Sequence, residues 1–139
     1  MFAVLLSTQL VAVGPAESSL KSLEGDWAVE QMEQKGKKFP TDLVLRVRLV
    51  VRGDVFTFVN GQTEFTSRVT KFEPSGEPRA IDLTRDADKQ TVRGIYKLEG
   101  DTLTICTNAR GERPTTFAAD PESPNVLTVY KRAAAPSDR

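Results

Sequence analysis

Three aspartates, Asp82, Asp86 and Asp88, form the densest group of carboxylates in this chain of 139 residues. Clustered carboxylates are the groups that hold a hard cation or carry out acid–base catalysis. In this sequence, however, they alternate with arginine and lysine, and the glycine and distal glutamate of a calcium-binding loop are missing at the required offsets. We therefore expect a charged surface loop and no metal site.

The chain contains one cysteine, Cys106, and no histidine. A cysteine nucleophile is normally activated by a histidine base, and imidazole is the commonest metal ligand, so both chemistries lack their usual residues. A single cysteine closes no intramolecular disulfide and builds no thiolate zinc cluster. We predict a non-catalytic protein with no cofactor, in which Cys106 fills a small apolar position in a strand.

Nineteen basic residues balance nineteen acidic residues, which gives a net charge of zero. A balanced chain has no overall field that would attract nucleic acid or an anionic membrane. A group of arginines is nevertheless predicted on one outer sheet face together with Phe72. These arginines are Arg46, Arg48, Arg52 and Arg68. The balanced charge favours a solvated face over a binding surface, so no nucleic-acid partner is expected.

The first residues, 1–16, are almost wholly apolar or small, and charged residues begin at Glu17. The stretch is too short for a membrane span, and Gly14 and Ala16 stand where a signal peptidase cuts, although no basic residue follows Met1. We expect a signal-peptide-like segment and a periplasmic or secreted protein with no stable membrane span after processing. The alternative is a buried amino-terminal segment. At the other end, 133–139 is predicted to be a disordered tail.

Between these ends, residues 20–132 alternate short β-branched and aromatic runs with Gly, Asn and Asp, the pattern of an antiparallel meander. Asn60-Gly61 is typical of a two-residue hairpin turn. The main helix signal is a single turn at 39–42, where Pro40 is tolerated at a helix start. Nine short strands are expected, at residues 25–32, 43–51, 55–59, 62–72, 80–84, 92–98, 102–106, 115–118 and 126–130.

Successive hairpins place sequence neighbours side by side, and such a meander leaves two exposed edges unless it closes. We therefore predict an all-β fold, a single antiparallel up-and-down barrel of eight to nine strands. The residues expected to point inward are Trp27, Val29, Leu45, Val47, Leu49, Val51, Phe56, Phe58, Phe65, Val69, Ile81, Leu83, Val92, Tyr96, Leu98, Leu103, Ile105, Phe117, Leu127 and Val129.

A barrel of eight strands is either filled by its own side chains or keeps room for one small ligand. Ser67 and Gly94, which are small and predicted to point inward, favour some room. Phe56, Phe58 and Phe65 on the central strands favour a filled interior. The sequence is compatible with either a filled or a hollow interior.

Gly25-Asp26-Trp27 opens the first predicted strand, and Lys131-Arg132 closes the last. A Gly-x-Trp segment with a basic side chain over the indole resembles the arrangement in lipocalins and other calycins. Trp27 would plug one end of the barrel, and a cation on its face would gain a cation–π contact. The resemblance assigns barrel closure to Gly25, Trp27 and Arg132.

Four segments in this order carry a more specific resemblance: 23–27 (LEGDW), 80–83 (AIDL), 94–103 (GIYKLEGDTL), and 111–115 (GERPT) followed by Phe117. Together they resemble a planctomycete lipocalin-like domain family of unknown function, over residues 20–132. Members of that family are often secreted or attached to larger extracytoplasmic proteins, and no activity is assigned to them. The resemblance therefore implies a fold and a location but no chemistry.

Two functions are compatible with these observations. The first is an exported lipocalin-like barrel that binds a small apolar or amphipathic ligand inside. The residues predicted to meet this ligand are Phe56, Phe58, Phe65, Tyr96, Arg110 and Arg113. The second is a non-catalytic protein-interaction module, with a filled barrel and with loops 73–79 and 110–115 against a protein partner. A cavity lined by the aromatic residues would favour the first function.

Overall fold

The computed structural model describes residues 20–133. The predicted processing segment, 1–16, and residues 134–139 of the predicted tail lie outside this range. The elements are β1 (Gly25–Gln34), β2 (Lys37–Lys38), α3 (Thr41–Val44), β3 (Val47–Arg52), β4 (Val55–Asn60), β5 (Thr63–Phe72), β6 (Arg79–Arg85), β7 (Thr91–Glu99), β8 (Thr102–Asn108) and β9 (Asn125–Arg132).

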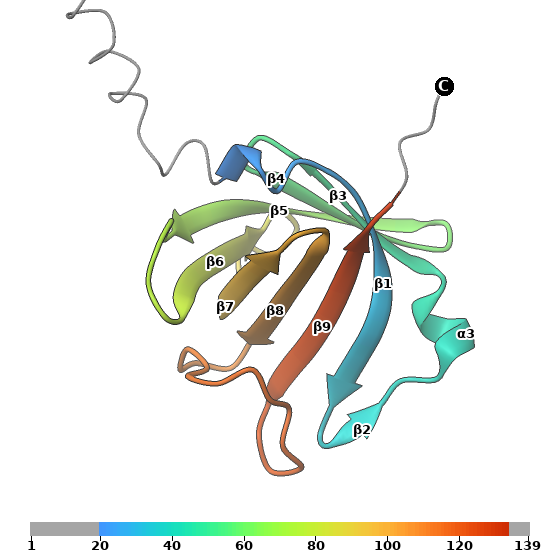
Figure 1. The fold of residues 1–139 in the computed structure, drawn as a ribbon, viewed down its shortest axis with the longest axis vertical. Coiled ribbons are helices and arrows are strands. Elements are labelled where there is room, and N and C mark those ends of the chain that lie inside the picture. The colour runs from blue at the N-terminus through green and yellow to red at the C-terminus, as the bar shows by residue number, and fades with distance from the viewer. Residues whose placement is uncertain (1–19, 134–139) are drawn as a thin grey trace, which may run out of the picture.

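The sheet closes on itself. Its order is β2-β1-β3-β4-β5-β6-β7-β8-β9, every pair is antiparallel, and β1 also pairs with β9. In Figure 1, β1 (blue) and β9 (red) accordingly lie side by side. Eight strands form the ring, and β2 is a short extra strand on the end of β1. The prediction of an up-and-down antiparallel barrel is confirmed.

The run predicted as one strand over 43–51 divides into two elements. Its first residues belong to the helix α3, which follows Pro40 with its φ of −58°, and β3 begins only at Val47. A proline backbone is already set for the start of a helix, so the neighbouring apolar residues enter a helical turn. The inward position predicted for Leu45 is wrong, because this residue ends the helix and is 71% exposed.

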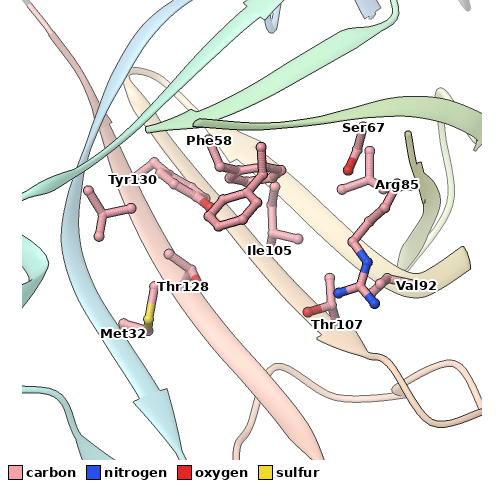
Figure 2. A pocket seen from close by; sticks show the side chains of 12 residues that line it. Met32, Phe58, Ser67, Arg85, Val92, Ile105, Thr107, Thr128 and Tyr130 are labelled. Carbon is pink, nitrogen blue, oxygen red and sulfur yellow. The ribbon is translucent and has the colours of Figure 1, made fainter. Parts of the chain in front are cut away.

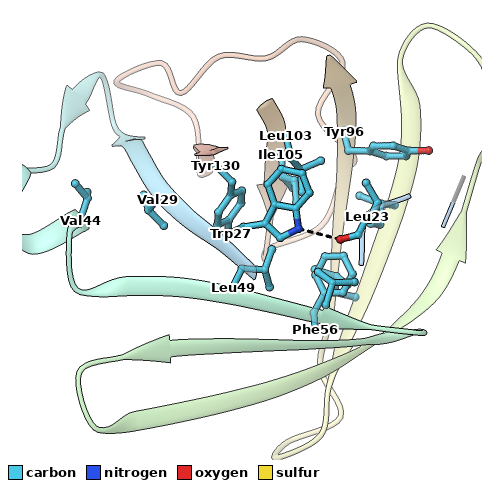
Figure 3. Close-up of a cluster of buried hydrophobic side chains, with 13 residues drawn as sticks. Leu23, Trp27, Val29, Val44, Leu49, Phe56, Tyr96, Leu103, Ile105 and Tyr130 are labelled. Atoms are coloured by element: carbon cyan, nitrogen blue, oxygen red, sulfur yellow. Dashed lines mark hydrogen bonds between the residues drawn. The ribbon is translucent and has the colours of Figure 1, made fainter. Parts of the chain in front are cut away.

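One end of the barrel is filled by apolar side chains around Trp27, and we call it the packed end. Trp27 is fully buried, and its indole N–H donates to the Leu23 carbonyl oxygen over 2.8 Å. Figure 3 shows Leu49, Phe56 and other core residues gathered around the indole. A large aromatic ring at this position removes much apolar surface from water, which favours a closed end.

The last strand completes the packed end. The Arg132 guanidinium lies over the Trp27 ring, 4.3 Å from its centroid. Its Nη1 and Nη2 donate to the carbonyl oxygens of Glu24 and Ser22, over 2.9 and 3.0 Å. A Cβ on Gly25 would lie 3.1 Å from Arg132 Nη1, so a glycine here leaves room for the guanidinium. Arg132 thus ties the segment before β1 over the indole.

The strands β7 and β8 are buried on their outer face as well. Ile95 and Cys106 are paired across these strands and are 1% and 0% exposed. Their sequence neighbours Tyr96 and Ile105 belong to the core inside the barrel, so Ile95 and Cys106 point outward. The connection 109–124 covers them, and the Cys106 thiol donates to the Ala118 carbonyl oxygen over 3.5 Å.

This outer layer overturns three of the inward predictions. Phe117 lies in the covering connection instead of a strand, 5.0 Å from the Lys97 ammonium group. Leu127 and Val129 pair with Cys106 and Thr104 on the covered outer face, while Thr128 and Tyr130 point inward. Apolar alternation identifies the inner face of a strand only where the outer face meets water, and here it does not.

A bulge changes the face of β5 near its end. The strand has the predicted inward residues Ser67 and Val69, but its register with β6 shifts between Val69 and Lys71. An extra residue in one strand turns the following side chains to the other face. Phe72, predicted on the outer face, is therefore packed against the core, with its ring 5.0 Å from that of Tyr96.

Candidate functional site

The end of the barrel opposite Trp27 holds a pocket of about 360 Å³. We call this end the open end. The side chains that line the pocket are Met32, Val47, Phe58, Phe65, Ser67, Leu83, Arg85, Val92, Ile105, Thr107, Thr128 and Tyr130. Its volume lies within the range of about 300–1,000 Å³ that is typical of small-molecule sites.

The two sides of the pocket differ in chemistry. Figure 2 shows Met32 and Phe58 on one side, and Ser67, Arg85 and Thr107 on the other. The first side is mainly apolar, although Thr128 and Tyr130 add hydroxyl groups to it, whereas the second offers two hydroxyl groups and a guanidinium. The lining is therefore suited to a molecule with an apolar body and a polar end.

The course of β1 explains why this end is hollow. β1 pairs with β3 only from Gly25 to Ala28, and beyond that point its pairs are with β9 and β2. The helix α3 stands beside the diverging strands in Figure 1, and its Val44 is buried in the core cluster. The register with β9 also shifts between Val29 and Gln31, and this bulge directs Met32 into the pocket.

Arg85 is the one charged residue among the side chains that line the pocket in the described chain. Its Nε and Nη2 donate to Asp88 Oδ1 and Oδ2 over 3.3 and 3.0 Å, and Nη2 also donates to Gln90 Oε1 over 2.5 Å. A hydrogen bond from the Gln90 backbone N–H, and then the Arg85 guanidinium, lower the pKa of Asp88. The loop between β6 and β7 therefore holds the guanidinium at the edge of the pocket.

Three further polar residues of the lining are buried, Ser67, Thr128 and Tyr130, and Thr128 is 6% exposed. Ser67 is 2% exposed and lies directly opposite Arg85 in the pairing of β5 with β6. Tyr130 is 4% exposed, and burial raises the pKa of its hydroxyl far above the usual range, although a hydrogen bond with Thr128 acts in the other direction. The phenol is therefore neutral at ordinary pH.

The structure separates the aromatic residues predicted to meet a ligand. Phe58 and Phe65 line the pocket, and Phe65 is 55% exposed at its mouth. Phe56 is fully buried in the packed end. Tyr96 also lies in the core, where its hydroxyl donates to the Glu73 carbonyl oxygen over 2.7 Å. Burial raises the Tyr96 pKa.

Arg110 and Arg113 were also predicted to meet a ligand, but neither lines the pocket. The Arg113 guanidinium donates from Nη1 to Asp82 Oδ1 and to the Gly94 carbonyl oxygen, over 2.5 and 3.0 Å. The Arg110 backbone N–H donates to Asn108 Oδ1 over 2.7 Å. The connection 109–124 folds back over the outer face of the barrel, and this course takes both arginines away from the interior.

The sequence predicted that Asp82 belongs to a charged surface loop, but this prediction is wrong. Asp82 lies within β6, is 8% exposed and is the carboxylate that holds Arg113. The other two aspartates are in the loop after β6, where Asp88 binds Arg85 and Asp86 accepts a hydrogen bond from Thr66 over 2.6 Å. The three carboxylates therefore have three different partners.

Arg85 and Met32 line the pocket but were not predicted from the sequence. The alternation of Ile81 and Leu83 continues to Arg85, so a strand extended by one residue would have identified it. Met32 depends on the bulge in β1, for which the sequence carries no clear signal. Thr128 was missed because its apolar neighbours were assigned to the inner face.

Residues 20–133 contain no group of three or more His, Cys, Asp or Glu side chains arranged to hold a metal ion. Within the same part of the chain, no helix has the length and apolar character needed to cross a bilayer.

Comparison of the chain with protein-family models, with curated proteins and with solved structures gives no significant match. The assignment of the fold therefore rests on the strand order, the closed pairing of β1 with β9, and the packing described above.

Proposed function

We propose that this chain is an exported, lipocalin-like binding protein that holds a small apolar or amphipathic molecule in the open end of its barrel. The pocket of about 360 Å³ is the observation that carries this proposal. Its floor is formed by side chains that also belong to the packed core, including Leu83, Ile105 and Tyr130. The hollow is thus bounded by core side chains on one side and opens beside Phe65.

A hollow that opens to water leaves apolar side chains solvated instead of packed. Protein interiors are packed to the density of organic crystals, and voids larger than a water molecule are few. The side chains around a hollow lose dispersion contacts on one side. A ligand of matching shape restores those contacts and removes apolar surface from water. This balance supports binding as the purpose of the hollow end.

Two parts of the proposal rest on the sequence. Export is supported by the apolar segment 1–16 with small residues at Gly14 and Ala16. A non-catalytic role is supported by a chain that has no histidine to activate its single cysteine. Membership of the planctomycete lipocalin-like family is proposed on the four segments that resemble it.

Native mass spectrometry of the full chain, purified gently from an exporting host, tests the proposal. We expect an added mass that is released when the same sample is denatured. The mass of the polypeptide itself reports whether the segment 1–16 has been removed. A chain without added mass that also binds no apolar fluorescent probe would contradict the proposal and favour the protein-interaction module.

A pair of variants separates the pocket from the surface. Val47 lines the pocket and its neighbour Arg48 is exposed on the outer face of β3. Val47→Trp fills part of the hollow and is expected to abolish probe binding. Arg48→Trp adds the same indole on the outer face, and probe binding is expected to be unchanged. Equal binding by both variants would show that the probe sits elsewhere.

A further inference from the structure

A buried hydroxyl marks the polar side of the pocket. Ser67 is 2% exposed and lines the pocket, and its hydroxyl has no hydrogen-bond partner among residues 20–133. A buried polar group left without a partner costs about 1–3 kcal/mol. Since nearly all buried polar groups in native proteins are satisfied, this hydroxyl calls for a partner inside the pocket.

Arg85 lies beside this hydroxyl and has unused donors. The two residues are directly opposite each other on β5 and β6, and both side chains reach the pocket. Asp88 and Gln90 occupy Nε and Nη2 of the guanidinium, whereas Nη1 has no partner in the described chain. In Figure 2 the guanidinium extends over the pocket beside Thr107. Ser67, Thr107 and the Arg85 guanidinium therefore line the same side of the pocket, with the guanidinium beside Thr107 and Ser67 paired with Arg85 across the two strands.

The opposite side of the pocket is mainly apolar, because Met32, Val47 and Phe58 on β1, β3 and β4 contribute to it together with the rings and methyl groups of Tyr130 and Thr128. The volume limits the length of an apolar group bound there. If each non-hydrogen atom takes about the 30 Å³ of a liquid water molecule, the pocket of about 360 Å³ holds roughly a dozen atoms. A straight chain of about ten carbons with a small polar head fills this space.

The head group that fits is a carboxylate. It carries only acceptors, so it can accept from Arg85 Nη1 and from the Ser67 hydroxyl together, and hydrogen bonds between charged partners are about twice as strong as neutral ones. Asp88 also faces the guanidinium. The side chains of Arg85 and Asp88 are 41% and 53% exposed, so water screens both the attraction of a bound carboxylate to Arg85 and its repulsion by Asp88. A cationic head would meet Arg85 unfavourably.

We propose that the pocket selects a medium-chain monocarboxylate, with its head held by Arg85 and Ser67 and its chain directed toward Met32, Val47 and Phe58. This inference rests on the binding function proposed above and names the chemical class of its ligand.

Calorimetric titration of the full chain with three probes of equal chain length tests the inference: decanoate, 1-decanol and decyltrimethylammonium. Decanoate is expected to bind about tenfold more tightly than 1-decanol, as one hydrogen bond to a charged group predicts. Decyltrimethylammonium is expected to bind more weakly than 1-decanol.

Three variants locate the head group. Arg85→Gln should weaken decanoate about tenfold and leave 1-decanol nearly unchanged, and Ser67→Ala should weaken decanoate about fivefold. Arg68→Gln removes the same charge from the outer face of β5, where Arg68 is 57% exposed, and should change neither affinity. Ser67→Ala is a small change that retains the loop contacts of Arg85, so it keeps the test valid if Arg85→Gln does not fold.

Equal affinities for decanoate and 1-decanol, or full decanoate affinity in Arg85→Gln or Ser67→Ala, would overturn the carboxylate assignment while the binding function stands. Failure of all three probes, together with failure of the apolar fluorescent probe, would overturn both proposals.

Discussion

The strand β1 takes part in both ends of the barrel, and its two halves have opposite surroundings. Near its start, Trp27 is fully buried beneath the segment 20–24 and the Arg132 guanidinium. Near its end, Met32 forms a wall of the pocket. Between them the pairing with β3 is lost and a bulge shifts the register with β9. The same strand thus borders a filled interior near its start and a hollow interior near its end.

The difference between the two ends indicates that the packed end stabilises the barrel while the open end keeps a hollow. The packed end gathers bulky side chains, Trp27, Phe56 and Leu103, which are fully buried. The open end has small or polar groups at inward positions, among them Ser67 and Thr107, and these leave volume unfilled. Because apolar burial provides most of the driving force for folding, stability concentrated at one end allows the other to remain open.

The largest effect is expected at the packed end. Trp27→Ala removes the indole and its hydrogen bond to Leu23, and should lower the free energy of unfolding by about 3–5 kcal/mol. Urea denaturation of variant and wild type measures the change. An unfolding free energy within about 1 kcal/mol of the wild type would contradict the role of Trp27 as the plug of this end.

A second prediction concerns the outer layer over β7 and β8. Arg113→Ala leaves Asp82, which is 8% exposed, without its ion pair and frees the connection 109–124. A hydrogen bond to a charged group contributes about 1.5–3 kcal/mol, so we expect a loss of this size.

The same variant should expose Cys106, whose thiol lies under this connection. Burial raises the pKa of that thiol in the wild type. Reaction with a thiol reagent should therefore be faster in Arg113→Ala. Unchanged reactivity would show that the connection is held by other contacts.

A third prediction uses Tyr130, which lies between the two ends and belongs to both the core and the pocket. Burial raises the pKa of this phenol in the folded state above the value of about 10 in an unfolded chain. The folded state therefore keeps the proton more tightly, and stability that is complete below pH 10 declines above it, by up to about 1.4 kcal/mol per pH unit.

Tyr130→Phe removes this group, so its stability should decline less between pH 9 and pH 11 than that of the wild type. Denaturant unfolding at the two pH values measures both slopes. Part of the decline should persist in the variant, because burial also raises the pKa of Tyr96. Parallel slopes would place the Tyr130 hydroxyl in contact with water through the pocket.

The smallest effect is expected at the open end. Met32 borders a hollow, so Met32→Ala removes fewer packed contacts than a core substitution and should cost roughly 1 kcal/mol. Leu49→Ala at the packed end, where Leu49 is fully buried, should cost about 2–5 kcal/mol in the same denaturation assay. Equal losses would remove the distinction between the two ends.

Much of the barrel follows from local signals. The turn between β4 and β5 is formed by Gly61 and Gln62, one residue after the predicted Asn60-Gly61, and Gly100-Asp101 connects β7 to β8. The alternation around Leu49 and Val51 correctly predicted the inner face of β3. These features depend on neighbours within a few residues, since turn geometry and side-chain alternation are local properties of the backbone.

The candidate site was harder to predict. Phe58 and Phe65 were identified from strand alternation, and both line the pocket. Arg113 was predicted to meet a ligand, but its position depends on the path of 109–124 across the outer face and on its ion pair with Asp82. A loop of this length is positioned by contacts with residues far away in the sequence, which a local pattern does not contain.

Local sequence was sufficient for the antiparallel order of the barrel strands and the place of Trp27, because hairpin turns and apolar alternation act over a few residues. The predicted strand at 115–118 is instead part of the connection between β8 and β9. The hollow at one end, the inner face of β9 and the meeting of Ser67 with Arg85 were decided only in the folded barrel. They depend on two bulges and on a connection that covers the outer face, and each of these is set by pairing between distant segments.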